Sequence, residues 1–237
     1  MPNHQKHRGQ QSKDKEIFDK KWQKIMSEAT DDMCFLLEKK YSENASLKLV
    51  GDHYQINERQ RKAVFRCACP LTNIGKRKQK SLSFNDIEGK TVAIDGYNLL
   101  IIVESMLSNG YIFKGRDGAY RDVASIHGTY KKVEETIPAL LLIANSLIDL
   151  KVKNVIWYLD SPISNSGRLK SLMRELAEEY YWHWEIELVN SPDKTLVALD
   201  FPVITADAWI LDNVTNWFNL SEYLIQNKIK DVNLVCL

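Results

Sequence analysis

Short apolar runs alternate with longer stretches of helical apolar spacing in the second part of the chain. Apolar runs rich in β-branched residues predict buried strands at 91–95, 155–159, 184–189 and 203–205, with a closing strand at 232–237. Helical spacing predicts connecting helices at 98–107, at about 125–150, from 165 or 166, through 210 and 211, and from about 221. This alternation is typical of a parallel, doubly wound sheet. We therefore predict a three-layer α/β/α, Rossmann-like domain over residues 89–237.

The first part of the chain carries helical patterns only. Two helices are predicted between 17 and 41, followed by a short helix at 46–50. A further helix is predicted from the cap at Asn57 to about Cys69, because Pro70 cannot continue it. These patterns predict a small all-α domain that precedes the α/β domain.

The boundaries of this first domain follow from composition. Residues 1–15 are polar and basic without an apolar core, which predicts a disordered basic tail and not a secretory signal. The helical domain then covers 16–88, and a linker over 81–89 leads into the second domain.

Overall composition describes an ordinary globular protein, with 44% hydrophobic residues and a net charge of +1. The four cysteines lack the spacing of a disulfide framework, which favours a reducing, cytoplasmic location. No stretch approaches the length of a membrane span, so no membrane association is expected. Phosphate-binding glycine loops and the Gly-x-Ser-x-Gly serine-hydrolase elbow are both missing from the sequence.

Positive charge gathers between residues 59 and 80, a stretch that contains no acidic residue. One-sided basic surface is the electrostatic footprint of phosphate-backbone binding. The alternative is a solvated face followed by a basic linker. The candidate nucleic-acid-binding residues are Arg59, Arg61, Lys62, Arg66, Lys76, Arg77 and Lys78.

Aspartates follow the predicted strands. Asp95, Asp160 and Asp207 lie at or within two residues of a strand end, and Asp193 follows the third strand. Because the carboxyl ends of parallel strands share one edge of a sheet, these carboxylates are expected to converge and to need a cation. Oxygen ligands suit Mg²⁺ or Mn²⁺, which lower the pKa of bound water and neutralise charge on a phosphodiester. The alternative is that each aspartate caps a helix or forms a turn.

Two loops carry further polar side chains. Arg116, Arg121 and His127 lie in and after a glycine-rich segment, where they are candidates to hold a phosphate. Ser164, Asn165 and Arg168 lie at a predicted helix start, a position that favours anions. In the alternative interpretation the first segment is a glycine-rich hairpin or loop with a helix cap.

Two stretches resemble known families. Asp95-Gly96-Tyr97-Asn98 after an apolar strand resembles the opening motif of NYN nucleases of the PIN-like superfamily, and 203–207 resembles the later strand–Thr-x-Asp element of PIN domains. Segments at 49–61, 93–98, 127–130, 157–167 and 210–212 resemble the prokaryotic proteins grouped as domain of unknown function 434.

The PIN-like resemblance implies metal-dependent RNA cleavage, with Asp95 and Asp207 as ligands and Asp160 or Asp212 as further candidates. It also implies an acidic residue on a helix. Asn98, at the end of the first resembling motif, is a candidate substrate-binding residue. The candidates for that acidic residue are Glu104, Glu134 and Glu135.

The sequence therefore predicts a cytoplasmic Mg²⁺- or Mn²⁺-dependent nuclease, and RNA is favoured over DNA as its substrate class. Catalysis is assigned to Asp95, Asp160 and Asp207, and metal binding to these three with Asp193 and Asp212. The alternatives are a non-catalytic RNA-binding adaptor and a phosphatase-like enzyme acting on a small phosphorylated substrate.

Overall fold

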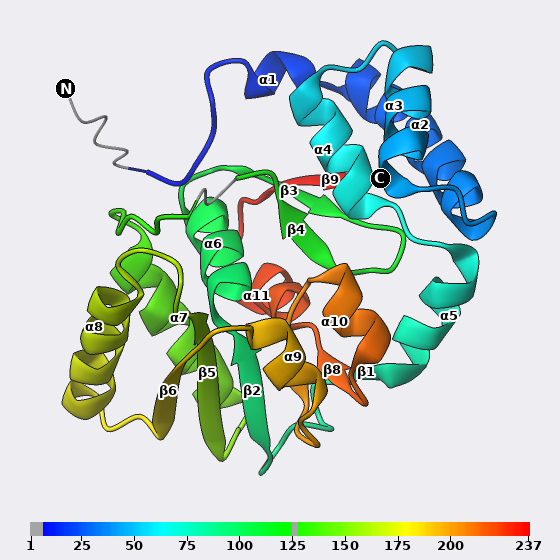
Figure 1. Ribbon diagram of the computed structural model, residues 1–237. Coiled ribbons are helices and arrows are strands. Elements are labelled where there is room, and N and C mark those ends of the chain that lie inside the picture. The colour runs from blue at the N-terminus through cyan, green and yellow to red at the C-terminus, as the bar shows by residue number, and fades with distance from the viewer. Residues whose placement is uncertain (1–6, 125–127) are drawn as a thin grey trace.

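A six-stranded, fully parallel sheet forms the centre of the protein in a computed structural model that describes residues 7–124 and 128–237 (Figure 1). Its strand order is β1-β8-β7-β2-β5-β6. The strands are β1 (Ser81–Leu82), β8 (Trp217–Phe218), β7 (Val203–Ile204), β2 (Thr91–Asp95), β5 (Asn154–Asp160) and β6 (Trp184–Val189). The predicted α/β class and parallel sheet are thus confirmed.

Helices cover both faces of this sheet, because side chains alternate along each strand. Val92 and Ile94 of β2 belong to a core shared with α7, α8 and α11, whereas Ala93 faces α9 and α10. The helices of this part are α6 (Gly96–Leu107), α7 (Thr136–Asp149), α8 (Ser166–Glu179), α9 (Pro192–Val197), α10 (Ala208–Asn213) and α11 (Leu220–Asn227). Asp95, two residues after Ala93, is thereby directed to the α9 and α10 side.

A second sheet of three strands pairs a hairpin from the middle of the chain with the last strand. Its order is β4 (Tyr120–Asp122), β3 (Tyr111–Lys114) and β9 (Asn233–Cys236). The predicted closing strand exists, but it pairs with β3 and not with the large sheet. This pairing arises from the hairpin at 111–122, in a segment for which the sequence leaves a glycine-rich hairpin or loop open.

The amino-terminal helices are α1 (Asp14–Ile17), α2 (Lys20–Glu38), α3 (Glu43–His53), α4 (Glu58–Cys67) and α5 (Leu71–Lys80). Helices α1 to α4 form a core with this second sheet on the side away from the large one, whereas α5 lies beside α10 (Figure 1). Met26 and Val64 share one buried cluster with Phe113 of β3 and Val235 of β9. The helical segment therefore completes a core with the later strands.

Several predicted boundaries in the first part are wrong. One continuous helix, α2, replaces the two predicted between 17 and 41, since Thr30 bonds back to the Met26 carbonyl instead of capping a new helix. The basic residues 76–80 belong to α5 and not to a loop. The predicted linker contains the edge strand β1, whose two residues pair with β8. Such short strands depend on tertiary pairing and leave no periodic pattern.

Part of the predicted disordered tail is ordered. The Arg8 guanidinium is buried and its Nε lies 2.8 Å from Glu104 Oε2, while residues 1–6 lie outside the described part. Asp14 is fully buried and pairs with Arg59. Within the described ranges, no helix has the length and hydrophobicity needed to cross a lipid bilayer.

Candidate active site

The carboxyl ends of β7, β2 and β5 lie side by side in the sheet. The chain passes from β2 to β5 on one side and returns to β7 on the other, so β2 and β7 flank a topological switch point, where α/β sheets bind ligands. Asp95 ends β2, and Thr205 directly follows β7. Asp193 and Asp207 come from the starts of α9 and α10, which cover the same side.

One hydroxyl group links the two strand ends. Thr205 Oγ1 donates to Asp95 Oδ2 at 2.8 Å and accepts the backbone N–H of Asp207 at 3.0 Å. The Ala206 N–H donates to Asn98 Oδ1 at 2.9 Å. These contacts fix Asp95 and Asp207 relative to each other and place the Asn98 side chain on the wall of the site.

Gly96 allows the close packing beneath this arrangement. A Cβ atom at Gly96 would lie 2.8 Å from the Tyr158 carbonyl oxygen and 2.5 Å from Leu159 Cδ2. Since neither the β5 backbone nor a fully buried leucine can give way freely, only glycine lets Asp95 turn directly into α6.

The carboxylates at this edge have few compensating partners. Burial, together with the negative charges of Asp207 and Asp193, raises the pKa of Asp95 to about 7 even though Thr205 opposes the shift. Partial burial and the charges of Asp207 and Asp160 raise the pKa of Asp193. The group therefore holds a negative charge that a cation or a proton would stabilise.

Asp207 also fulfils the alternative interpretation. Its Oδ1 accepts the backbone N–H groups of Trp209 and Ile210 at 2.9 and 3.0 Å, so it is the N-cap of α10. Oδ2 has no such capping role. The cap and a ligand-binding role are compatible because they use different oxygen atoms.

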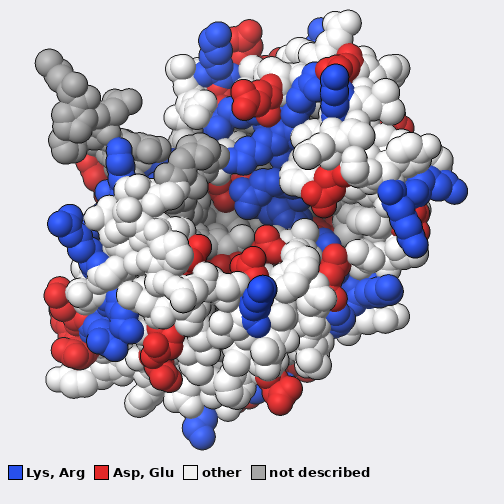
Figure 2. All heavy atoms as spheres, viewed as in Figure 1, with Lys and Arg blue, Asp and Glu red and all other residues white. Residues whose placement is uncertain are grey.

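Asp95, Asp193 and Asp207 line one pocket of about 260 Å³. Its other wall contains Arg66 of α4, which lies 3.5 Å from Asp122 and donates to the Asp122 carbonyl. Figure 2 shows acidic and basic surfaces facing each other across a hollow in this face of the molecule. The full lining is Arg66, Asp95, Tyr97, Asn98, Ile101, Asp122, Ala124, Asp193 and Asp207.

Asp160 lies beside this group without lining the pocket. Its charge contributes to the raised pKa of Asp193, and burial raises its own pKa. Asp160 Oδ1 is buried without a hydrogen-bond partner. The structure thus places Asp95, Asp193 and Asp207 on the wall of one pocket and leaves Asp160 outside its lining.

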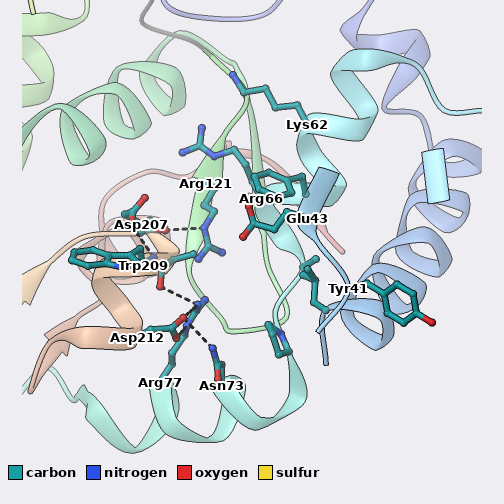
Figure 3. Close-up of a pocket in the computed structure, with 16 residues that line it drawn as sticks. Tyr41, Glu43, Lys62, Arg66, Asn73, Arg77, Arg121, Asp207, Trp209 and Asp212 are labelled. Carbon is teal, nitrogen blue, oxygen red and sulfur yellow. Dashed lines mark hydrogen bonds and ion pairs between the residues drawn. The ribbon is translucent and has the colours of Figure 1, made fainter. Parts of the chain in front are cut away.

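A second pocket of about 640 Å³ adjoins the first and shares Arg66 and Asp207 with it (Figure 3). Asp212, a predicted metal ligand, is instead paired here with Arg77 at 2.7 Å and accepts a hydrogen bond from Asn73. Its carboxylate is already neutralised, which corrects the metal assignment.

Arg77 and Arg121 are structural and not surface residues. Both side chains are buried, and both form ion pairs with the fully buried carboxylate of Asp117. Arg121 Nε also donates to the Ala206 carbonyl and Arg77 Nη2 to the Ala208 carbonyl. Nucleic-acid binding by Arg77 and direct substrate binding by Arg121 are therefore corrected: these two residues clamp the segment that carries Asp207.

Most of the basic stripe is also engaged within the protein. Arg59 pairs with Asp14, Arg61 pairs with Asp52, and Lys62 donates to the Val123 and Ala124 carbonyls. Lys76 and Lys78 are exposed on α5. Arg66 is the member of this set that lines the aspartate pocket, since it lies on the face of α4 turned to β4.

The loop residues predicted to bind substrate lie elsewhere. Asn165 donates to the Tyr130 carbonyl, and the Ser164 backbone bonds with residues 128 and 130. Arg116 pairs with Asp31 of α2, and Arg168 is exposed on α8. None of these four residues lines the described aspartate pocket. His127 lies outside the described residues.

Glu104, Glu134 and Glu135, the candidates for the additional acidic residue of the site, lie apart from the aspartates. Glu104 is fully buried and accepts hydrogen bonds from Arg8, Tyr130 and Thr136. Glu135 accepts from His7, and Glu134 is largely exposed. Their described contacts hold residues 7–8 against α6 and do not reach the aspartates.

Three residues of the site were not assigned to it from sequence. Thr205 positions Asp95, Asp122 faces Arg66, and Tyr97 lines the pocket with a buried hydroxyl that has no hydrogen-bond partner. The Thr-x-Asp spacing contained a signal for Thr205. Asp122 belongs to a strand of the second sheet, so nothing in local sequence links it to the strand-end aspartates.

The oxygen atoms of the pocket are of the kind that a hard divalent cation prefers, although the described residues form no ready cation cluster. Within 7–124 and 128–237, no three His, Cys, Asp or Glu side chains lie close enough together to hold an ion. Asp95, Asp193 and Asp207 nevertheless supply carboxylate oxygens to one pocket, and Mg²⁺ is commonly held by one or two carboxylates plus water.

Two protein families match separate segments of the chain. The family described as domain of unknown function (DUF5616) matches residues 84–223. The chain belongs to this DUF5616 family. Protein of unknown function (DUF434) matches residues 25–80, which confirms the DUF434 resemblance for that segment. No solved structure matches.

One relative covers most of the chain. Uncharacterized protein MJ0935 of Methanocaldococcus jannaschii is 30% identical over 186 residues, which cover 78% of this chain and 88% of that protein. The DUF5616 match contains Asp95, Asp193 and Asp207, whereas Arg66 falls in the DUF434 match. The pocket is therefore built from both matched segments.

Proposed function

We propose that this DUF5616 protein is a divalent-metal-dependent nuclease of the PIN-like kind that cleaves phosphodiester bonds, with RNA favoured over DNA. The observation that carries the proposal is the pocket in which Asp95, Asp193 and Asp207 face Arg66. A phosphodiester bridging these walls places its charge between an arginine and a cation, which is the arrangement that phosphoryl transfer needs.

The side chains divide the work. Asp95 and Asp207, with Asp193, would hold Mg²⁺ or Mn²⁺, and the bound ion would supply charge neutralisation and activation of water for hydrolysis. Thr205 keeps the Asp95 carboxylate in place through its 2.8 Å hydrogen bond. Arg66 binds a phosphate oxygen, since guanidinium groups match phosphate geometry. Asn98 fixes the Ala206 backbone beside the scissile position.

A non-catalytic RNA-binding adaptor is the second candidate. It is favoured by the N-cap role of Asp207 and by the lack of a ready cation cluster in the described ranges. An adaptor would bind RNA through Arg66 and the exposed Lys76 and Lys78 without a need for metal.

Cleavage of labelled single-stranded RNA with Mn²⁺ separates the candidates. We expect wild type to cleave and Asp95→Asn to lose at least 100-fold in rate, on the scale of removing one electrostatic stabiliser. Asp207→Asn should lose rate as well, because asparagine still caps a helix but carries no charge.

Asp231→Asn is the matched control, because Asp231 is exposed and lines neither pocket. It should keep the wild-type rate. Metal-independent RNA binding by wild type without cleavage would overturn the nuclease and support the adaptor.

A further inference from the structure

Trp209 presents a large aromatic ring beside the candidate catalytic carboxylates. Its backbone N–H donates to Asp207 Oδ1, and its side chain lines the 640 Å³ pocket with 48% of its surface exposed. The next residues of α10, Ile210 and Leu211, are fully buried. The core packing of this helix therefore does not need a tryptophan at 209.

The surroundings of Trp209 are charged. Figure 3 shows Arg66 extending from α4 toward the side of the pocket where Asp207 and Trp209 lie. If the phosphate of a nucleotide lies between Arg66 and the aspartates, the base of a neighbouring nucleotide can lie on the side of the pocket where Figure 3 places the Trp209 indole. Stacking of a base on an aromatic side chain is worth about 1–3 kcal/mol and tolerates any base.

The pocket continues along α4. Lys62 and Phe65 line both this pocket and an open groove of about 770 Å³, whose walls also include Lys13, Arg59 and Arg61. The three hollows share lining residues and follow one another along α4, and the walls of the groove carry the acidic Asp14 and Glu58 as well as the basic side chains. A small phosphorylated metabolite would fill only the part nearest the aspartates.

We propose that Trp209 is a specificity-determining residue that stacks on an unpaired nucleobase next to the phosphate bound at the aspartate pocket. This inference rests on the proposed function and adds its substrate requirement: a polynucleotide whose base at this position is free of a pairing partner. A base in a duplex already stacks on both neighbours and cannot offer its face to the indole.

The test compares binding of two fluorescein-labelled oligomers by anisotropy. One is an eight-nucleotide single-stranded RNA, and the other has the same backbone with abasic sugars throughout. Full-length Asp95→Asn is the background, because it prevents cleavage under the proposed function. We expect the base-bearing oligomer to bind about 5- to 150-fold more tightly, the range that one stacked base supplies.

Substitutions assign this preference to the indole. Trp209→Ala should abolish most of the difference between the oligomers, and Trp209→Phe should retain most of it. Tyr181→Ala is the matched control, since Tyr181 is 88% exposed and lies outside these pockets. It should leave the preference unchanged.

Each outcome separates this inference from the proposed function. Equal binding of both oligomers, or a preference that survives Trp209→Ala, overturns the stacking role whether or not wild type cleaves RNA. A preference that depends on Trp209 supports it even if wild type fails to cleave, in which case the adaptor function holds. Absence of both binding and cleavage overturns the two proposals together.

Discussion

Asp95 and Asp117 are both buried carboxylates near the ends of strands, yet their surroundings are opposite. Asp117 lies 2.6 Å from Arg121 and also pairs with Arg77, and these two cations lower its pKa despite burial. Asp95 has one hydroxyl donor and two acidic neighbours, and its pKa is raised to about 7. A neutralised carboxylate stabilises a fold, whereas a carboxylate left among like charges is available for a ligand.

The two groups are also connected. Arg121 and Arg77 donate to the Ala206 and Ala208 carbonyls, on either side of Asp207. The paired group, Asp117 with Arg77 and Arg121, thus holds in place the segment that carries Asp207, one of the acidic neighbours of Asp95. Because Arg77 lies on α5, the amino-terminal helices contribute to the geometry of the site as well as to its charge.

The largest expected effect comes from breaking the paired group. Asp117→Asn leaves the buried Arg121 without a carboxylate and leaves Arg77 with Asp212 alone, so it should lower the free energy of unfolding by about 3–5 kcal/mol. Urea denaturation measures it. Asp52→Asn is the control, since it breaks the more exposed pair with Arg61 and should cost only about 0–1 kcal/mol. A similar small cost for Asp117→Asn would contradict the structural role.

The same substitution at Asp95 should have the opposite sign. A folded-state pKa of about 7, above the unfolded value, means that Asp95 favours folding below about pH 4 and loses this contribution as the pH rises to 7. Without divalent cations, Asp95→Asn should therefore stabilise the protein at pH 8 by up to a few kcal/mol. The gain should vanish near pH 4.

Urea denaturation across this pH range checks the prediction. Asp231→Asn should shift stability little at any pH, because Asp231 is exposed. A destabilising Asp95→Asn at pH 8 would mean that Asp95 is satisfied in the way that Asp117 is.

Removal of the Thr205 hydroxyl, which opposes the raised pKa of Asp95, should have a smaller effect on stability. Thr205→Val removes the donor to Asp95 and the acceptor for the Asp207 N–H, at a cost of about 1–2 kcal/mol. It should also raise the pKa of Asp95 further, so the pH dependence of unfolding moves to higher pH. Thr205→Ser keeps the hydroxyl and should retain the wild-type pH dependence of unfolding. The same pH dependence for Thr205→Val and Thr205→Ser would contradict an effect of the Thr205 hydroxyl on the pKa of Asp95.

The large sheet and its strand-end aspartates were predictable because each depends on local pattern. The run from Thr91 to Asp95 reads as a buried strand from its own residues, and parallel pairing then brings Asp95 and Asp207 to one edge. The pairing of Arg77 with Asp212, 135 positions apart in sequence, has no local signature. A basic stretch therefore looks the same in sequence whether its cations face solvent, as Lys76 does, or a buried carboxylate, as Arg77 does.

Calorimetric titration of Mn²⁺ into wild type, Asp95→Asn and Asp231→Asn at pH 8 tests the central claim most directly. The account predicts binding by wild type and by Asp231→Asn, and loss of binding by Asp95→Asn. Equal Mn²⁺ binding by all three proteins, or no binding by wild type, would contradict the assignment of the aspartate pocket as a cation site.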